Sequence, residues 1–198
     1  PNTRSVLRGG MLRPRESPLI PLHSSYRTRP AVETLAVGEA LMRSLGISRV
    51  TDITRMDRLG LPVCVSVRPR SAGLRVHSGK GLSGVEARAS ALMEAVEHAA
   101  AEPQCGDWAP RRLSMAEIEA QFAGRLRIAD FVPVSRAALD PHTSVVTAPC
   151  EELGRRARVR LPAEVVFYPY SDAAATRLFG ATTNGLASGN SVEEATLH

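Results

Sequence analysis

The stretch of the chain with the clearest chemical potential is SGKGLSGVEARASALMEAVEH, residues 78–98. A Gly-Lys-Gly turn leads into a segment whose Ser90, Glu94 and Glu97 share one narrow stripe at the helical angle of about 100° per residue. Carboxylates three residues apart repel each other unless a cation lies between them. Carboxylate and hydroxyl oxygens also suit Mg²⁺ that holds a phosphate chain. The stripe is therefore a candidate magnesium–nucleotide site, and its alternative is an ordinary solvated helix edge.

The Gly-Lys-Gly turn does not satisfy the pattern of a Walker A loop. That loop requires G-x-x-x-x-G-K-[ST], because the hydroxyl after the lysine reaches Mg²⁺. Here Gly73 and Gly79 enclose five residues instead of four, and Gly81 occupies the position of the required Ser or Thr. A P-loop is therefore excluded. Ser83 and Glu86 fit a capping box, which explains that pair without any ligand.

The second unusual stretch is TTNGLASGNSVEEATLH, residues 182–198. Gly185 and Gly189 allow close approach of the backbone, and Asn190 or Ser191 can cap a helix. Glu194 stands where it would complete a capping box from Ser191. Taken alone, the stretch predicts a flexible loop followed by the start of a helix.

The elements that must position these residues follow from periodicity and from glycine and proline signals. The 84–102 helix is predicted to be largely buried, because charge is confined to one stripe and the flank formed by Ala87, Ala91 and Ala95 is small and apolar. Further helices are expected at 31–45 and 114–122, and strands at 61–69, 74–79, 129–135, 143–149 and on both sides of a proline bend within 156–170. This mixed order predicts an α+β fold with mixed sheets and packed helices. Residues 1–30 are expected to form an irregular arm.

Composition sets the broad class of the protein. The chain has 198 residues, a net charge of +5 and 4% aromatic residues. Its arginines are scattered and aromatic faces for stacking bases are few, so nucleic acid is not the expected partner. No apolar run is long enough to cross a bilayer and no signal peptide is evident, so we expect no membrane partner. Three separated cysteines without ligand spacing favour a reducing, cytoplasmic location.

The pairing of GKG…SALMEAVEH with the later NGLASGNSVEEA resembles the YcaO family. The segments YRTRPAVETL, LGISRVTDITRMDRLGLPV and VRPRSAGLRVHSGKGLS are similar to the N-terminal sequence of that family, above all to its stand-alone branch found with TfuA-type partners. The resemblance covers nearly the whole chain. It implies that residues 31–198 form part of a YcaO-like catalytic domain, whose ATP-binding fold continues beyond the given C-terminus.

The activity implied by this resemblance is ATP- and Mg²⁺-dependent activation of a peptide backbone amide by O-phosphorylation, during modification of a ribosomally synthesised peptide. The product is an azoline when a neighbouring side chain attacks, and a thioamide when an external sulfide source does. The N-terminal likeness favours the thioamide. The implied partners are a precursor peptide, a TfuA-like protein and a second copy of the chain in a homodimer.

Motif matching assigns the site residues that the resemblance implies. Glu94, Glu97 and Glu194 would be metal ligands, and Ser90 and Asn190 would join them in binding Mg²⁺ and ATP. Arg27 and Thr34 match nucleotide-contacting positions, and Lys80 with Gly81 belongs to the Gly-Lys-Gly turn. No catalytic residue is assigned.

Two departures from the family pattern motivate an alternative. The first motif usually ends E-x-x-E-R, but His98 follows Glu97 here, and a neutral histidine supplies no fixed positive charge. The second E-x-x-E-R motif would lie beyond His198. The alternative is a catalytically weak homologue that acts as a scaffold for a peptide or a partner. His77, His98 and His142 lack ligand-spaced companions in the sequence and are expected to be structural, and Cys64 is expected in the core.

Overall fold

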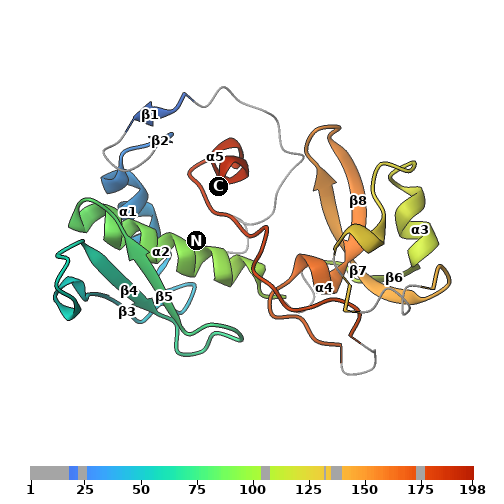
Figure 1. Cartoon of the computed structure of the whole chain (residues 1–198), viewed down its shortest axis with the longest axis horizontal. Coiled ribbons are helices and arrows are strands. Elements are labelled where there is room, and N and C mark those ends of the chain that lie inside the picture. The colour runs from blue at the N-terminus through green and yellow to red at the C-terminus, as the bar shows by residue number, and fades with distance from the viewer. Residues whose placement is uncertain (1–17, 22–25, 104–107, 132, 135–139, 173–176) are drawn as a thin grey trace. The chain divides into compact units, whose positions relative to one another are not determined.

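The fold is seen in a computed structural model that describes residues 18–21, 26–103, 108–131, 133–134, 140–172 and 177–198. The chain divides into two units (Figure 1). The first contains Pro1–Ala100 and Gly185–His198, and the second contains Ala101–Asn184. Most of the expected N-terminal arm, residues 1–17 and 22–25, lies outside the described residues.

The first unit contains a three-stranded antiparallel sheet in the order β3 (Arg49–Asp52), β4 (Val63–Val67) and β5 (Val76–Lys80). Alternate residues of β4 and β5 are buried, so that Cys64, Ser66, His77 and Gly79 face the interior. The burial of Cys64 confirms its predicted place in the core. Two short strands, β1 (Ile20–Pro21) and β2 (Tyr26–Arg27), form a separate antiparallel pair, and a 3-10 turn, η2, spans Thr54–Met56.

Two helices of the first unit complete its core: α1 (Ala31–Leu41) and α2 (Gly84–Ala101). Leu92 of α2 is fully buried beside Ile47 and contacts α1 at Gly38, where an added Cβ would lie 3.2 Å from the Cβ of Leu92. The predicted buried helix is confirmed with nearly its predicted bounds. The predicted 31–45 helix begins where expected but ends at Leu41, and a turn continues to Gly46, whose φ of +69° favours glycine.

The small flank of α2 explains how the helix lies on the sheet. Ala87 and Ala91 are fully buried against Cys64. A Cβ at Gly79 would lie 2.5 Å from the carbonyl oxygen of Ala87, so the strand and helix backbones are in direct contact there. Ser66 donates a hydrogen bond to the carbonyl of Ala91 at 2.7 Å. Val85, in the first turn of α2, is 42% exposed although it is apolar.

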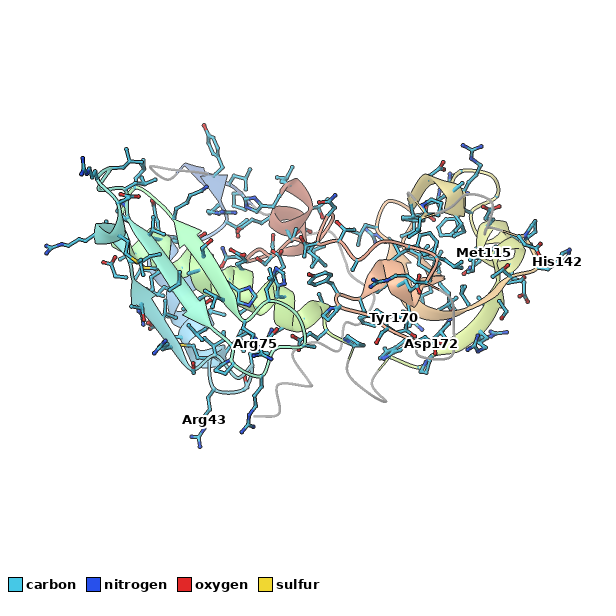
Figure 2. The ribbon with its side chains drawn as sticks, turned by 60° about the horizontal axis from the view of Figure 1, so that its bottom comes forward. Arg43, Arg75, Met115, His142, Tyr170 and Asp172 are labelled. Carbon is cyan, nitrogen blue, oxygen red and sulfur yellow. The ribbon has the colours of Figure 1, made fainter. Side chains whose placement is uncertain are left out.

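The second unit is built on an antiparallel sheet, β6 (Arg111–Ser114), β7 (Ser144–Glu152) and β8 (Ala157–Pro162). Its helical elements are α3 (Met115–Ala120), the 3-10 turn η3 (Ile128–Phe131) and α4 (Ala163–Val166). Ser114 caps α3 in a complete capping box with Glu117. Met115 belongs to the apolar core of this unit, whereas His142 is exposed (Figure 2).

The predicted α+β class is confirmed, but two predicted strands are wrong. Residues 128–131 form η3, because the carboxylates of Glu119 and Asp130 accept hydrogen bonds from the backbone of Ile128 and Arg127. After the predicted bend at Pro162, the chain forms α4 instead of a second strand, and Glu164 of α4 accepts hydrogen bonds from the backbone of Leu178 and Phe179. Among the described helices, none is long and apolar enough to cross a membrane.

Candidate functional site

A cavity of about 610 Å³ lies in the first unit, and all eight residues assigned above to ATP and Mg²⁺ line it. They come from β2, α1, the end of β5, α2, the loop before α5 (Val192–Leu197), and α5 itself. The structure therefore brings together side chains from distant segments of the sequence: Arg27, Thr34, Lys80, Ser90, Glu94, Glu97, Asn190 and Glu194.

The stripe of α2 forms the acidic wall of the cavity. The side chains of all three residues line the cavity. Ser90 is exposed, whereas Glu94 and Glu97 are partly buried. Burial raises the pKa of Glu94, the neighbouring charge of Glu97 raises it further, and a backbone hydrogen bond from Ser78 opposes both effects. A cation between these two carboxylates would relieve that cost.

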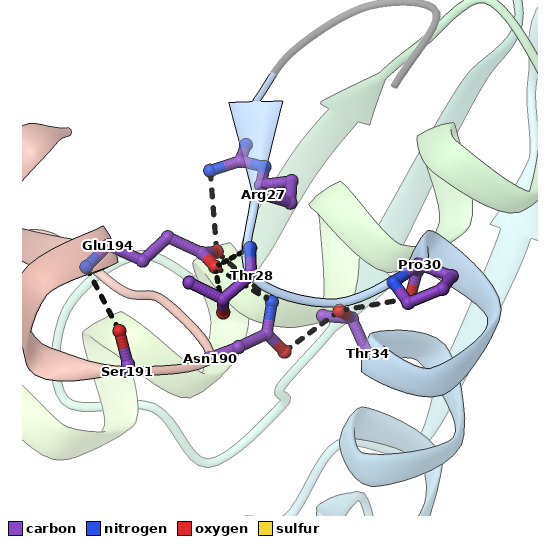
Figure 3. A network of polar contacts seen from close by, with 7 residues as sticks. All are labelled: Arg27, Thr28, Pro30, Thr34, Asn190, Ser191 and Glu194. Atoms are coloured by element: carbon purple, nitrogen blue, oxygen red, sulfur yellow. Dashed lines mark hydrogen bonds and ion pairs between the residues drawn. The ribbon is translucent and has the colours of Figure 1, made fainter. Parts of the chain in front are cut away.

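The facing wall is organised around Glu194, which α5 holds with only 3% of its side chain exposed. Its Oε2 accepts hydrogen bonds from the backbone N–H of Thr28 at 2.8 Å and from the Thr28 hydroxyl at 2.6 Å (Figure 3). Asn190 Nδ2 donates to both carboxylate oxygens, at 3.1 and 3.2 Å, and Arg27 forms an ion pair at 3.6 Å. Burial by itself raises the pKa of Glu194, but the hydrogen bonds from Thr28 and Asn190 together hold it below its usual value.

Asn190 extends this network to α1. Its Oδ1 accepts a hydrogen bond from the Thr34 hydroxyl at 2.8 Å, while its amide donates to Glu194 (Figure 3). One side chain therefore links the first turn of α1 to the first turn of α5, across 156 positions of the sequence. Two predicted residues of the site, Thr34 and Asn190, thus contact each other directly.

The two capping boxes predicted at the starts of α5 and α2 form only in part. Ser191 accepts a hydrogen bond from the backbone of Glu194 at 3.2 Å, but the Glu194 carboxylate turns to Thr28 and Asn190 instead of completing the box. Ser83 likewise accepts from the backbone of Glu86, whose carboxylate binds the N–H of Leu82. Glu194 is therefore a member of the cavity network, which a local capping motif cannot reveal.

A family model described as YcaO cyclodehydratase, ATP- and Mg²⁺-binding, matches residues 78–198, more than half of the chain, which include the α2 stripe and the Asn190–Glu194 segment. The chain belongs to the YcaO family. The predicted resemblance is confirmed, and so are ATP and Mg²⁺ as the cofactors of this family domain. The acidic cavity agrees with that description, since oxygen donors gather on it next to Lys80 and Arg27.

Relatives of this YcaO chain include an uncharacterized protein of Methanothermobacter thermautotrophicus, 33% identical over 184 residues, which cover 86% of this chain and 43% of the relative. A protein of Rhizobium leguminosarum bv. trifolii, described as uncharacterized and in the tfuA 3′ region, is 36% identical over 183 residues, covering 88% of this chain and 41% of the relative. The chain thus spans less than half the length of these curated relatives.

Solved structures show the same fold. The YcaO protein of Methanopyrus kandleri, bound with AMPPCP and Mg²⁺, is 28% identical with a TM-score of 0.60, over 87% of this chain and 42% of that one. A heterocyclase in complex with substrate and cofactor has a TM-score of 0.65 at 21% identity, over 91% of this chain and 28% of that one. The latter likeness supports the fold alone.

Two features of the YcaO chain escaped sequence analysis. Thr28 supplies two hydrogen bonds to Glu194, and a single threonine in an arginine-rich segment carries no signal of this role. His77 and His98 were expected to lack companions, but their rings lie 4.7 Å apart, next to Glu94. A match between the inward face of β5 and the last turn of α2 requires the register of strand and helix, which the sequence does not give.

The residues of the cavity fit Mg²⁺ and ATP by their donor chemistry. Glu94, Glu97 and Ser90 offer hard oxygens, which Mg²⁺ prefers. In Glu194, Oε2 accepts hydrogen bonds from Thr28 and Asn190, whereas Oε1 accepts one from Asn190 and has a longer contact with Arg27. Because a carboxylate has about four lone-pair directions, Oε1 is the oxygen better placed to bind a metal. Glu94, Glu97 and Glu194 line the same cavity, which therefore offers carboxylate oxygens from both α2 and α5.

Proposed function

We propose that this protein uses ATP and Mg²⁺ to activate a backbone amide of a ribosomally synthesised peptide, and that the product is a thioamide. The observation that carries the proposal is the meeting of the α2 stripe with the Asn190–Glu194 network on one cavity within the region matched by the YcaO model. The relative from the tfuA 3′ region supports the thioamide branch and a TfuA-like partner.

Each wall of the cavity has a part in this proposal. Glu94 and Glu97 would hold Mg²⁺ from α2 with the hydroxyl of Ser90, and Glu194 would do so from α5. Lys80 and Arg27 are the cations that would face phosphate oxygens. Asn190 and Thr34 would contact the nucleotide and fix the position of Glu194 through the hydrogen bonds already formed.

The chemical need for a nucleotide follows from the amide itself, whose oxygen is a very poor leaving group. When bound, ATP supplies the phosphoryl group that takes up this oxygen, and Mg²⁺ neutralises the phosphate charge. The protein's own task is to bind and orient the nucleotide, and the half-buried setting of Glu94 and Glu97 strengthens their attraction for a cation.

Calorimetric titration of the purified protein with Mg·ATP tests the cavity assignment. Wild-type protein should bind, and Glu97→Gln should weaken binding about tenfold or more, because one charged metal ligand is lost. Glu39→Gln is the matched control, since Glu39 is an exposed glutamate whose ion pair with Arg88 is at the surface and lies outside the cavity. Equal affinity in all three proteins would contradict the assignment.

The product is tested by mass spectrometry of a precursor peptide incubated with the protein, ATP, Mg²⁺, a sulfide source and a TfuA-like protein. Exchange of one backbone oxygen for sulfur would support the thioamide. Loss of one water would instead show azoline formation. If the protein bound the nucleotide but the peptide mass did not change, the assignment of a peptide substrate would be wrong. Sedimentation of the same preparation tests the proposed homodimer.

A second candidate is a scaffold with weak catalytic power. The observation that favours it is the position of His98, which is 5% exposed against His77 and does not line the cavity. At this position the family usually has an arginine, whose fixed positive charge can face a phosphate. His98 would not provide that charge. Absence of Mg·ATP binding, with retained affinity for the precursor peptide, would select the scaffold.

A further inference from the structure

Strand β5 presents His77 to the interior beside the last turns of α2. The strand alternates exposed and buried residues, and His77 is only 1% exposed. Two residues later, Gly79 lies directly against the backbone of α2, where a Cβ would come within 2.6 Å of the carbonyl carbon of Ser90. The missing side chain lets the strand approach the helix closely, and this approach brings His77 next to α2.

Helix α2 supplies the two other members of a cluster. Glu94 and His98 are four residues apart, so they lie on the same face of the helix. The rings of His77 and His98 are 4.7 Å apart between centroids and tilted by 48°. One ligand atom from each of His77, Glu94 and His98 lies within 4.8 Å of the other two.

The donor set of this cluster differs from that of the acidic stripe. Two imidazole nitrogens and one carboxylate oxygen suit Zn²⁺ and its neighbours in the first transition series, whereas Mg²⁺ prefers oxygen ligands alone. Two histidines and one glutamate also form a known three-residue zinc set, with a fourth position open to water or to a ligand.

We propose that His77, Glu94 and His98 bind a divalent transition-metal ion of the zinc class, at a site that shares only Glu94 with the magnesium–nucleotide site. Donor atoms around tetrahedral zinc lie about 3.3 Å apart when the bonds are roughly 2.0–2.1 Å. The donors must therefore draw together from their present separation of up to 4.8 Å when the ion binds. The direct backbone contact at Gly79 holds the strand and the helix at a fixed separation, as a metal site requires.

This site goes beyond the proposed function, because it needs neither nucleotide nor peptide. His77 and His98 do not line the cavity, whereas Glu94 does. Glu94 therefore belongs to both groups of residues, and a metal bound by the histidines would fix the position of this carboxylate at the cavity wall.

The test is titration of the purified protein with Zn²⁺ by calorimetry, and with Co²⁺ by visible absorption, in the absence of nucleotide and magnesium. We expect one ion per chain and cobalt bands typical of nitrogen and oxygen ligands. His98→Gln and His77→Gln should each weaken binding about tenfold or more, since each removes one of three ligands. Circular dichroism of each variant verifies its fold. If buried His77→Gln does not fold, His98→Gln decides.

The matched control is His142→Gln, the same substitution at an exposed histidine of the second unit (Figure 2). It should bind zinc with the affinity of the wild type. Three results would overturn the proposal: no saturable zinc binding by the wild type, unchanged affinity in folded His98→Gln, or an intense thiolate-to-cobalt band that shows binding by cysteine. Because no nucleotide is present, these results are independent of whether the nucleotide proposal holds.

Discussion

Thr28 and Glu194 are joined by two hydrogen bonds across 166 positions of the sequence, at 2.8 Å from the backbone N–H and 2.6 Å from the hydroxyl. Both bonds reach the same carboxylate oxygen, Oε2. Because Glu194 is nearly buried and carries a charge, these bonds fix its side chain at the cavity wall. The segment before α1 therefore takes part in the site through Thr28, although Thr28 does not line the cavity.

Thr28→Val should lower the free energy of unfolding by about 1.5–3 kcal/mol, which is the usual contribution of a hydrogen bond to a charged group. The substitution keeps the size of the side chain and the backbone bond but removes the hydroxyl donor. Urea-induced unfolding measures the change. Thr196→Val is the control, because its exposed hydroxyl bonds only the carbonyl of Val192 within α5. A loss no larger than that of the control would contradict the role of Thr28.

Glu194 should also make stability depend on pH. Burial raises its pKa, but the hydrogen bonds from Thr28 and Asn190 outweigh this effect, so the pKa lies below the ordinary 4.5. A carboxyl group with a lowered pKa stabilises the fold fully above its unfolded value, and this stabilisation is lost as pH falls through the folded value. The difference in unfolding free energy between wild type and Glu194→Gln should therefore be constant near neutral pH and shrink on acidification. Parallel curves throughout would refute this expectation.

Sequence signals identified the segments that line the cavity but not the long-range contacts that hold them together. Side chains on the α2 stripe follow from helical period alone, and the family likeness added Arg27, Thr34 and Asn190, which all line the cavity. What the sequence did not reveal was long-range pairing. The hydroxyl of Thr28 and the carboxylate of Glu194 meet only after the two segments pack, and neither has a local signature of that contact.

The failures in secondary structure have the same cause. Residues 129–135 and 163–170 carry apolar and β-branched residues that favour strands locally. In the fold, residues 128–131 form a 3-10 turn and 163–166 a short helix, and Glu119 and Glu164 accept hydrogen bonds from the backbone N–H groups of Ile128 and Leu178. Local propensity does not report such contacts, which lie beyond neighbouring residues.

Glu94→Gln should separate binding from stability. Burial and the charge of Glu97 raise the pKa of Glu94, so its ionised form destabilises the fold at neutral pH without metal. Neutralising it should raise the unfolding free energy by about 0.2–0.5 kcal/mol, the usual cost of a like-charged pair on a helix. The same variant should lose most of the thermal stabilisation that Mg·ATP gives the wild type. Differential scanning calorimetry with and without Mg·ATP measures both effects, and Glu39→Gln should leave the stabilisation by Mg·ATP unchanged, because Glu39 lies outside the cavity.

If the variant were less stable than the wild type without ligand, the repulsion between Glu94 and Glu97 would not be the governing effect. If it kept the full stabilisation by Mg·ATP, Glu94 would not be a ligand. The two outcomes test different claims, because the first concerns the free protein and the second the bound one.

Gly79→Ala tests the contact that places β5 against α2. Its added Cβ would lie 2.5 Å from the carbonyl oxygen of Ala87 and 2.6 Å from the carbonyl carbon of Ser90, and rigid backbone cannot move aside as a flexible side chain can. Overpacking of this kind costs about 1–3 kcal/mol, so urea-induced unfolding should shift by that amount. Gly84→Ala is the matched control, since a Cβ at the first residue of α2 would meet nothing within 4 Å. Alanine favours helices, so this control should be neutral or slightly stabilising.

Gly79→Ala should also weaken zinc binding, because the strand and the helix must separate to admit the Cβ. Equal stability and equal zinc affinity of Gly79→Ala and Gly84→Ala would show that β5 and α2 do not touch at Gly79.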